Sequence, residues 1–283
     1  MESKYLQQLS AAAAIQAGHA VMDIYKSSFS VKEKQDGSPV TQADEVSHRL
    51  IRAALKTSGI PLISEEGRHP PYHIRRTWDC CWLVDPLDGT REFVAGNDEF
   101  TINIALIRKS EPVFGMIYAP VQGTLWAGMQ GEGICRIDHA DEWTPGTDKL
   151  KLHFAVPKRL YGEPSPSGTR RIAVSRSHPD VRTEAFIRRI EKMPGHNIRQ
   201  VRGSSLKFCD LAEQYIHIYP RFASIWEWDT AAGHAILKAA GGEVYDARSG
   251  QPLIYNKESL KNPAFLALAD KNELSRFLAE GSL

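Results

Sequence analysis

Asp85-Pro86-Leu87-Asp88-Gly89-Thr90, which follows the apolar run Trp82-Leu83-Val84, is the stretch that decides the fold. It predicts a strand that ends in a turn, because proline removes a ladder donor and is tolerated at a strand end. Such a turn can direct the side chains of Asp85 and Asp88 and the carbonyl of Leu87 at one point, as a cation requires. A helix beginning at Gly89-Thr90 would add free backbone N–H groups, which bind phosphate.

Three further motifs place acidic residues in a fixed order along the chain. They are Gly37-Ser38-Pro39-Val40-Thr41-Gln42-Ala43-Asp44, Ile63-Ser64-Glu65-Glu66-Gly67 and Trp228-Asp229-Thr230-Ala231-Ala232-Gly233-His234. With residues 85–90 they resemble the lithium-sensitive, magnesium-dependent phosphatases of the inositol monophosphatase superfamily. The resemblance extends from about residue 34 to about residue 264. Four motifs in the family's order make it specific.

This resemblance implies both a fold and a metal centre. The expected fold combines α+β and α/β character in a layered α-β-α-β-α sandwich of the inositol monophosphatase and fructose-1,6-bisphosphatase type. The first metal site would use Glu65, Asp85 and the Leu87 carbonyl. The second would use Asp85, Asp88 and Asp229, and a third, weaker ion is expected near Glu65. Li⁺ is expected to inhibit by occupying one of these positions.

The same resemblance implies the catalytic groups, which are Asp44, Thr90 and Glu65. Asp44 and Thr90 match the pair that orients or deprotonates the attacking water. The backbone of Gly89 and Thr90 matches the phosphate cradle. Hydrolysis would then proceed without a covalent enzyme intermediate.

The acidic residues themselves favour a divalent cation. Carboxylates roughly 5 Å apart repel by several kcal/mol at an effective dielectric near 20, and a divalent ion removes that penalty. An all-oxygen ligand set without convergent cysteine or histidine favours Mg²⁺ over Zn²⁺. Two ions roughly 3.5 to 4 Å apart could activate the water and stabilise the leaving oxygen.

Three segments bear on the substrate: Ser175-Arg176-Ser177-His178-Pro179, Gly203-Ser204-Ser205-Leu206-Lys207-Phe208 and Tyr219-Pro220-Arg221-Phe222. They resemble the nucleotide-binding segments of the 3′(2′),5′-bisphosphate nucleotidases, the bacterial sulfur-assimilation branch. In that interpretation Ser204, Lys207 and Arg221 hold the 5′-phosphate and ribose end, and His178 lies beside the sugar or base. The alternative is that Lys207 and Arg221 are surface charges and that His178 caps a helix. Glu227 is either a support for Asp229 or a surface acid.

Composition is that of an ordinary globular protein. The chain has 283 residues, 24% charged and 42% hydrophobic, with 35 basic and 34 acidic residues and a net charge of +1. This balance gives no reason to expect a nucleic-acid polymer as partner, while a small anionic substrate needs only a local basic patch. Four cysteines without a C-x-x-C pair favour a reducing, cytoplasmic location. A monomer, a homodimer and peripheral contact with the cytoplasmic face of the inner membrane are all compatible with the sequence.

Periodicity predicts two parts, residues 1–155 and residues 156–283, joined in a proline- and glycine-rich stretch. In the first part, amphipathic helices over 6–24 and 45–55 precede strands over 100–106, 113–118, 124–129 and 134–137 in an antiparallel meander. Polar residues 32–38 look like a loop. In the second part, strands over 172–175, 216–219 and 243–245 alternate with helices over 181–192, 206–213 and 229–240. This alternation favours a mixed or parallel sheet flanked by helices.

The leading functional hypothesis is a Mg²⁺-dependent phosphatase that removes the 3′-phosphate of adenosine 3′,5′-bisphosphate to give AMP. Its role would lie in recycling this nucleotide during sulfur assimilation. An inositol-1-phosphate phosphatase would share the metal chemistry and differ at Ser204, Lys207 and Arg221. A metal- or nucleotide-sensing protein without activity is the alternative from another class, but every expected ligand is in place, as is Thr90.

Overall fold

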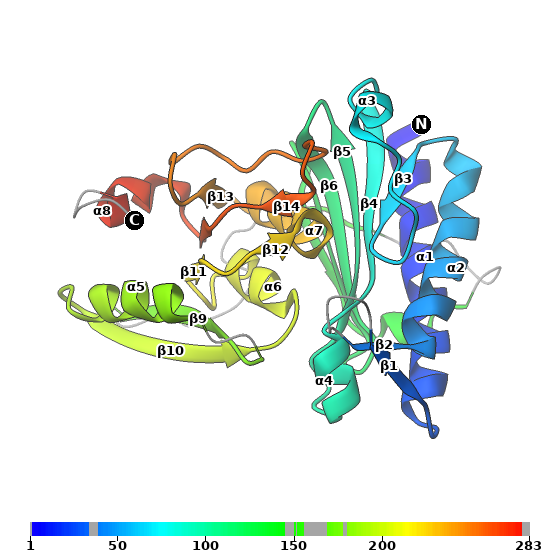
Figure 1. Ribbon diagram of the computed structural model, residues 1–283, viewed down its shortest axis with the longest axis horizontal. Coiled ribbons are helices and arrows are strands. Elements are labelled where there is room, and N and C mark those ends of the chain that lie inside the picture. The colour runs from blue at the N-terminus through cyan, green and yellow to red at the C-terminus, as the bar shows by residue number, and fades with distance from the viewer. Residues whose placement is uncertain are drawn as a thin grey trace.

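Five layers make up the protein, as Figure 1 shows. The computed structural model describes residues 2–33, 39–144, 150, 152–155, 169–177 and 180–278. Two long helices cover a six-stranded sheet, two further helices fill the space behind it, and a five-stranded sheet with its own outer helices completes the stack. The predicted layered sandwich is therefore confirmed.

The first sheet runs in the order β3-β4-β5-β6-β7-β8. Its strands are β3 (Leu62–Ser64), β4 (Cys80–Asp88), β5 (Thr101–Arg108), β6 (Glu111–Ala119), β7 (Thr124–Met129) and β8 (Gly133–Ile137). β3 pairs with β4 in parallel, and every later pair is antiparallel. The predicted meander is thus confirmed, with every strand end within two residues of the expected one.

Helices α1 (Glu2–Tyr25) and α2 (Gln42–Leu55) cover one face of this sheet. Leu6, Ala13 and Ala17 are buried on α1, as the spacing of apolar residues predicted. α2 begins three residues before the expected start because Thr41 caps it. The Thr41 hydroxyl accepts a hydrogen bond from the Ala43 N–H at 3.1 Å, and the Thr41 N–H donates to the Asp44 carboxylate in a capping box.

Helices α6 (Leu206–Ala212) and α7 (Glu227–Ala239) lie between the two sheets. α7 approaches the first sheet so closely that two positions there must be glycine. A Cβ at Gly115 would lie 2.2 Å from the Ala232 carbonyl oxygen, and one at Gly128 would lie 2.4 Å from the Ile236 Cα. The helix that carries Asp229 is therefore in backbone contact with the sheet that carries Asp85.

The second sheet runs in the order β10-β9-β11-β15-β13 and mixes parallel with antiparallel pairs, as predicted. Its strands are β9 (Thr169–Ser175), β10 (His196–Arg202), β11 (Ile218–Arg221), β13 (Glu243–Asp246) and β15 (Phe265–Leu268). The outer layer consists of α5 (Val181–Glu191) and α8 (Leu274–Leu278). β10 and β15 were not predicted.

Short elements complete the description. They are β1 (Val31–Glu33), β2 (Pro39–Thr41), α3 (Tyr72–Arg75), α4 (Thr90–Ala95), β12 (Ile225–Trp226), β14 (Lys261–Asn262) and the 3₁₀ turns Lys56–Ser58, Ala140–Glu142 and Lys271–Glu273. The loop expected over 32–38 is in part the strand β1, and residues 34–38 lie outside the described residues. The boundary expected at residues 155 and 156 adjoins undescribed residues and stays a prediction. Among the helices described, none is long and apolar enough to pass through a bilayer.

Candidate metal and phosphate site

Three carboxylates from distant parts of the chain meet where the first sheet faces α7. Glu65 follows β3, Asp85 lies in β4 and Asp229 lies in the first turn of α7; one ligand oxygen of each lies within 4.8 Å of the others. Burial, and then the charges of Glu65 and Asp88, raise the pKa of Asp85 well above its usual value. Burial, and then the charges of Asp88 and Glu65, do the same for Asp229. The groups resist ionising together, and the all-oxygen donor set fits a hard divalent cation.

β4 continues through the motif that was expected to end it. Its pairing with β5 shifts register between Asp85 and Asp88, so the two carboxylates share a strand and an irregularity turns them to one cavity. The Leu87 N–H donates to Asp85 Oδ1 at 3.0 Å, and this bond fixes the bend. Asp85 and Asp88 both line this cavity. The expected end of the strand is wrong, because an irregularity within β4, and not a turn after it, changes the direction of the chain.

Asp88 is held by side chains from β5 and from the start of α6. Its Oδ2 accepts hydrogen bonds from Ser204 Oγ at 2.8 Å and from Ser205 Oγ at 2.6 Å. Asn103 Nδ2 donates to the same oxygen at 3.3 Å and to Ser205 Oγ at 2.9 Å. Ser205 also reaches the Asp229 carbonyl oxygen at 3.1 Å. Ser205 and Asn103 therefore tie Asp88 to α7, a role that the sequence analysis missed.

Asp44 and Thr90 form a hydrogen-bonded pair beside these carboxylates. Thr90 Oγ1 donates to Asp44 Oδ1 at 3.0 Å, while Asp44 Oδ2 accepts from the Thr41 N–H at 2.7 Å and from Thr41 Oγ1 at 2.8 Å. Asp44 is buried, and burial raises its pKa against the opposing effect of the Thr41 hydrogen bonds. The pair has the geometry of a carboxylate base and a hydroxyl relay.

Gly89 joins β4 to the short helix α4 with a φ of 91°, a left-handed conformation that favours glycine. A helix does begin at Thr90, as expected, and it is six residues long. Gly89, Thr90 and Arg91 line a cavity of about 250 Å³ together with Glu65, Asp85, Leu87, Asp88 and Asp229.

The residues expected to hold the nucleotide line the same cavity where they are described. Lys207 is 4% exposed, and its Nζ donates to the carbonyl oxygens of Ser204 at 2.6 Å and Arg202 at 3.3 Å. Arg221 Nη1 donates to Ser175 Oγ at 3.1 Å, and its buried Nε has no hydrogen-bond partner among the described atoms. The alternative that these two are surface charges is wrong. His178 lies outside the described residues, and the cap of α5 is Asp180.

Two neighbours of the motifs serve packing. Trp82 is fully buried, and Trp228 is 3% exposed between the rings of Trp226 and His69, each with its centroid 5.0 Å away. Glu227 is fully buried, so the interpretation of it as a surface acid is wrong.

A further link at the cavity mouth was not predicted. Arg176 Nε donates to Glu99 Oε2 at 2.7 Å, and the Gly203 N–H donates to the same oxygen at 2.8 Å. Glu99 thereby joins the α4–β5 connection to the turn that holds Ser204. Arg176 belongs to the substrate segment 175–179, and Glu99 directly precedes the strand expected over 100–106. A contact between residues so far apart in the chain leaves no pattern in the local sequence, so it could not be predicted.

The model of one protein family matches almost the whole chain. It is the model described as the inositol monophosphatase family, and it matches residues 2–279. The chain belongs to this family. The 3′(2′),5′-bisphosphate nucleotidase CysQ of Escherichia coli K12 is 38% identical over 254 residues, which cover 88% of this chain and 94% of that protein.

Solved structures of the inositol monophosphatase family agree with this assignment. CysQ from Bacteroides thetaiotaomicron, described as a bacterial member of the family, superposes with a TM-score of 0.84 at 39% identity, covering 96% of this chain and 98% of that one. A Thermotoga maritima IMPase superposes with a TM-score of 0.70 at 23% identity over 96% of this chain and 95% of that one. The second likeness shows the fold.

Proposed function

We propose that the protein is a Mg²⁺-dependent 3′(2′),5′-bisphosphate nucleotidase that removes the 3′-phosphate of adenosine 3′,5′-bisphosphate, giving AMP and phosphate. The observation that carries this proposal is the cavity that the carboxylate cluster, Thr90 and Arg221 line together, with Asp44 hydrogen-bonded to Thr90 behind the wall. Identity to the CysQ nucleotidases over most of the chain supports the same substrate class. The role that follows is recycling of this nucleotide in sulfur assimilation.

Glu65, Asp85 and Asp229, with Asp88 and the Leu87 carbonyl beside them, would hold two magnesium ions, and Glu65 would share a third. When bound, the ions neutralise the carboxylates and stabilise the charge of the phosphate and of the leaving oxygen. Ser204, Ser205 and Asn103 limit the freedom of Asp88 through their hydrogen bonds. This arrangement orients the donor set before substrate arrives.

Asp44 and Thr90 would handle the proton of the attacking water. Thr90 Oγ1 already donates its hydrogen to Asp44 Oδ1, so a lone pair of this hydroxyl is left to accept a hydrogen bond from water. As the water attacks phosphorus, a proton would pass from it to Thr90 while the Thr90 proton passes to Asp44. The 3′ oxygen, released as its bond to phosphorus breaks, would take a proton from solvent water. The backbone N–H groups of Gly89 and Thr90 would bind the phosphate.

A side-by-side assay of phosphate release tests the function. The substrates are adenosine 3′,5′-bisphosphate, inositol 1-phosphate and fructose 1,6-bisphosphate, each with Mg²⁺ and again with Li⁺ added. We expect the nucleotide to have the highest kcat/KM and Li⁺ to inhibit. A higher kcat/KM for inositol 1-phosphate would replace the proposal by the inositol-phosphatase alternative, and release from none of the three would favour a sensing role.

Replacement of Arg221 by alanine is expected to raise KM for adenosine 3′,5′-bisphosphate about tenfold to a hundredfold with little change in kcat. The reason is that a charge-assisted hydrogen bond to the 5′-phosphate, worth about 1.5 to 3 kcal/mol, is the same before and after hydrolysis at the 3′ position. The unpartnered Arg221 Nε supports this assignment. Steady-state kinetics with the bisphosphate and with adenosine 3′-monophosphate check it.

The monophosphate lacks the group that Arg221 would bind, so it should lose much less on this substitution. Lys207→Ala is expected to impair both substrates in part, because the Lys207 ammonium also holds the Ser204 and Arg202 carbonyls. Arg199→Ala is the matched control, since Arg199 is paired with Glu184 and Glu191 away from the cavity. Equal losses for both nucleotides in Arg221→Ala would contradict recognition of the 5′-phosphate.

The cysteines support a proposal about the cellular location of the protein. All four are free thiols, and Cys81, Cys135 and Cys209 are buried. Free thiols persist in a reducing compartment, so a cytoplasmic location is part of the proposal. Its assembly as monomer or homodimer, and peripheral contact with the inner membrane, remain expectations from the sequence.

A further inference from the structure

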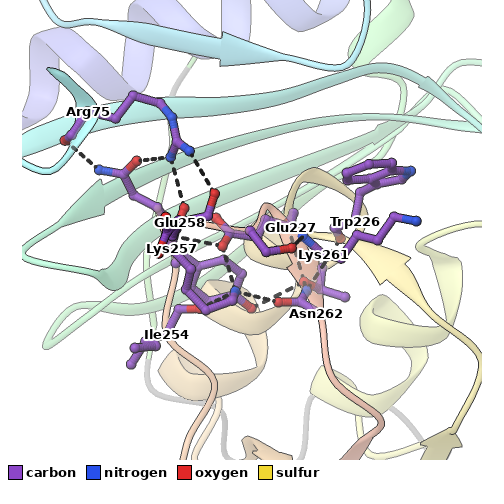
Figure 2. A network of polar contacts seen from close by, with 12 residues as sticks. Arg75, Trp226, Glu227, Ile254, Lys257, Glu258, Lys261 and Asn262 are labelled. Carbon is purple, nitrogen blue, oxygen red and sulfur yellow. Dashed lines mark hydrogen bonds and ion pairs between the residues drawn. The ribbon is translucent and has the colours of Figure 1, made fainter. Parts of the chain in front are cut away.

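Residues 254–262, here called the strap, join the two segments that bring Glu65 and Asp229 to the metal centre. Figure 2 shows the strap between Arg75 and the first turn of α7. Arg75 belongs to α3, in the segment that follows Glu65, and the first turn of α7 contains Asp229. The contacts at each end of the strap are dense and buried.

At the α7 end, the strap is bound by Glu227. This carboxylate is fully buried, two residues ahead of Asp229. Its Oε2 accepts from the Asn256 N–H at 2.5 Å, and its Oε1 accepts from the Lys257 N–H at 3.1 Å and from Lys257 Nζ at 2.5 Å. Two backbone groups and an ammonium therefore converge on a single side chain, and such charge-assisted bonds are the strong ones.

The rest of the strap closes around the same helical turn. Lys257 Nζ also donates to the Ile254 carbonyl at 2.8 Å and to Asn262 Oδ1 at 2.9 Å. Asn262 Nδ2 donates to Thr230 Oγ1 at 2.7 Å, and the Glu227 N–H donates to the Leu260 carbonyl at 2.9 Å. The residues on both sides of Asp229 are thus bonded to the strap.

At the α3 end, the strap is bound by Arg75. Arg75 is 3% exposed; its Nη1 donates to Asn256 Oδ1 at 2.7 Å and to the Lys257 carbonyl at 3.0 Å, and its Nη2 donates to the Glu258 carbonyl at 3.2 Å. Asn256 Nδ2 returns a bond to the Arg75 carbonyl at 2.9 Å. Asn256 has a φ of 58°, so the strap bends at a position that suits asparagine or glycine.

None of Glu227, Lys257, Asn256 and Arg75 lines the cavity, so this network does not touch substrate. It instead opposes the mutual repulsion of Glu65, Asp85 and Asp229, which burial makes strong. We infer that Glu227 is a positioning residue, which acts through the strap to hold Asp229 at a fixed place relative to Glu65 and so sets the affinity of the site for its divalent cation. This inference rests on the proposed metal site.

Glu227→Gln tests it with nearly unchanged shape. The amide lacks the charge that binds Lys257 and can no longer accept at every one of its contacts. We expect Mg²⁺ affinity, measured by calorimetric titration without substrate, to fall about 10- to 100-fold, the usual cost of removing a group that orients a metal ligand. In the assay, the Mg²⁺ concentration for half-maximal rate should rise equally, while kcat at saturating Mg²⁺ stays near the wild-type value.

Asn256→Gly tests the strap from its other end. Glycine accepts the positive φ and keeps the N–H that bonds to Glu227, but it removes both side-chain bonds to Arg75. Loss of ordinary hydrogen bonds predicts a smaller fall in Mg²⁺ affinity, about twofold to tenfold. If Glu227→Gln does not fold, Asn256→Gly still tests whether the strap sets the Mg²⁺ affinity.

Glu213→Gln is the matched control. Glu213 is also a buried carboxylate, bonded to Trp126 Nε1 at 2.6 Å and to Arg136 Nη1 at 3.0 Å, but it lies at the far end of α6 from the cavity. The Glu213→Gln variant should have a lower Tm than the wild-type protein but the same Mg²⁺ affinity. Wild-type affinity in a folded Glu227→Gln or Asn256→Gly variant would overturn the inference, as would equal losses in the control. Absence of Mg²⁺ binding by the wild-type protein would instead refute the proposed function itself.

Discussion

Replacement of Asp44 by asparagine is expected to lower kcat by about 10²- to 10⁴-fold while KM changes little. Asp44 Oδ1 receives the Thr90 hydrogen bond at 3.0 Å, and asparagine cannot take up the proton that this hydroxyl would pass on. The loss belongs to the transition state, because binding of the phosphate does not use the basic carboxylate. Steady-state kinetics with adenosine 3′,5′-bisphosphate at saturating Mg²⁺ measure the effect.

The pH profile gives a second measurement on the same residue. Burial raises the pKa of Asp44, and the base works only when it is deprotonated. Activity should therefore fall as pH decreases through this raised pKa, at a higher pH than the value of about 3.9 for a free aspartate would give. The acid limb due to Asp44 should be missing from the residual activity of Asp44→Asn.

Thr41→Ala separates catalysis from helix capping at this position. It removes the hydroxyl that bonds to Asp44 Oδ2 and to the Ala43 N–H, but it leaves the carboxylate in place. We expect a stability loss of about 1 kcal/mol and a much smaller fall in kcat than in Asp44→Asn.

A wild-type kcat in Asp44→Asn would remove Asp44 from the mechanism.

Removal of divalent metal is expected to abolish turnover, and Mg²⁺ is expected to restore it. Without a cation, the charges of Glu65, Asp85 and Asp229 oppose the approach of a phosphate. Binding should also stabilise the fold. At a Mg²⁺ concentration a hundredfold above Kd the gain is about 2.7 kcal/mol, which corresponds to roughly 5 °C in Tm for a chain of this size.

Asp85→Asn is the comparison variant for both measurements, turnover and Tm. Removing one charge from a buried cluster should raise the Tm of the metal-free protein and greatly reduce the further rise with Mg²⁺. It should also eliminate most activity. Full turnover of the wild-type protein in excess chelator would contradict the metal mechanism.

Local patterns in the sequence predicted most of the first half of the fold. The alternation at Ile102 and Ile104 predicts a strand, and both side chains are fully buried in the structure. β10 escaped detection because its sequence, His196–Arg202, is largely polar; it is an edge strand whose side chains are mostly exposed or half-buried. β15 (Phe265–Leu268) is a short apolar run, which periodicity alone does not distinguish from a buried helix segment.

The metal ligands could be predicted because each lies in a motif with its own local sequence. Most residues that hold these ligands in place could not be predicted. Asn103 looks like the polar member of an alternating strand, and its contact with Ser205 joins residues far apart in the chain. The sequence offers Glu227 as a support for Asp229 or as a surface acid and does not decide between them, because its partners Asn256 and Lys257 carry no mark of their own in the sequence.

The close contact of α7 with the first sheet at Gly115 and Gly128 has a consequence for redesign of this protein. Backbone in contact with backbone leaves no room to widen the metal half of the cavity by repacking. New substrate preferences must therefore be built on other lining residues, at Ser175–Ser177, Arg221 and Ser224. A library restricted to these residues would keep the hydrolytic chemistry constant while it samples the shape of the leaving group.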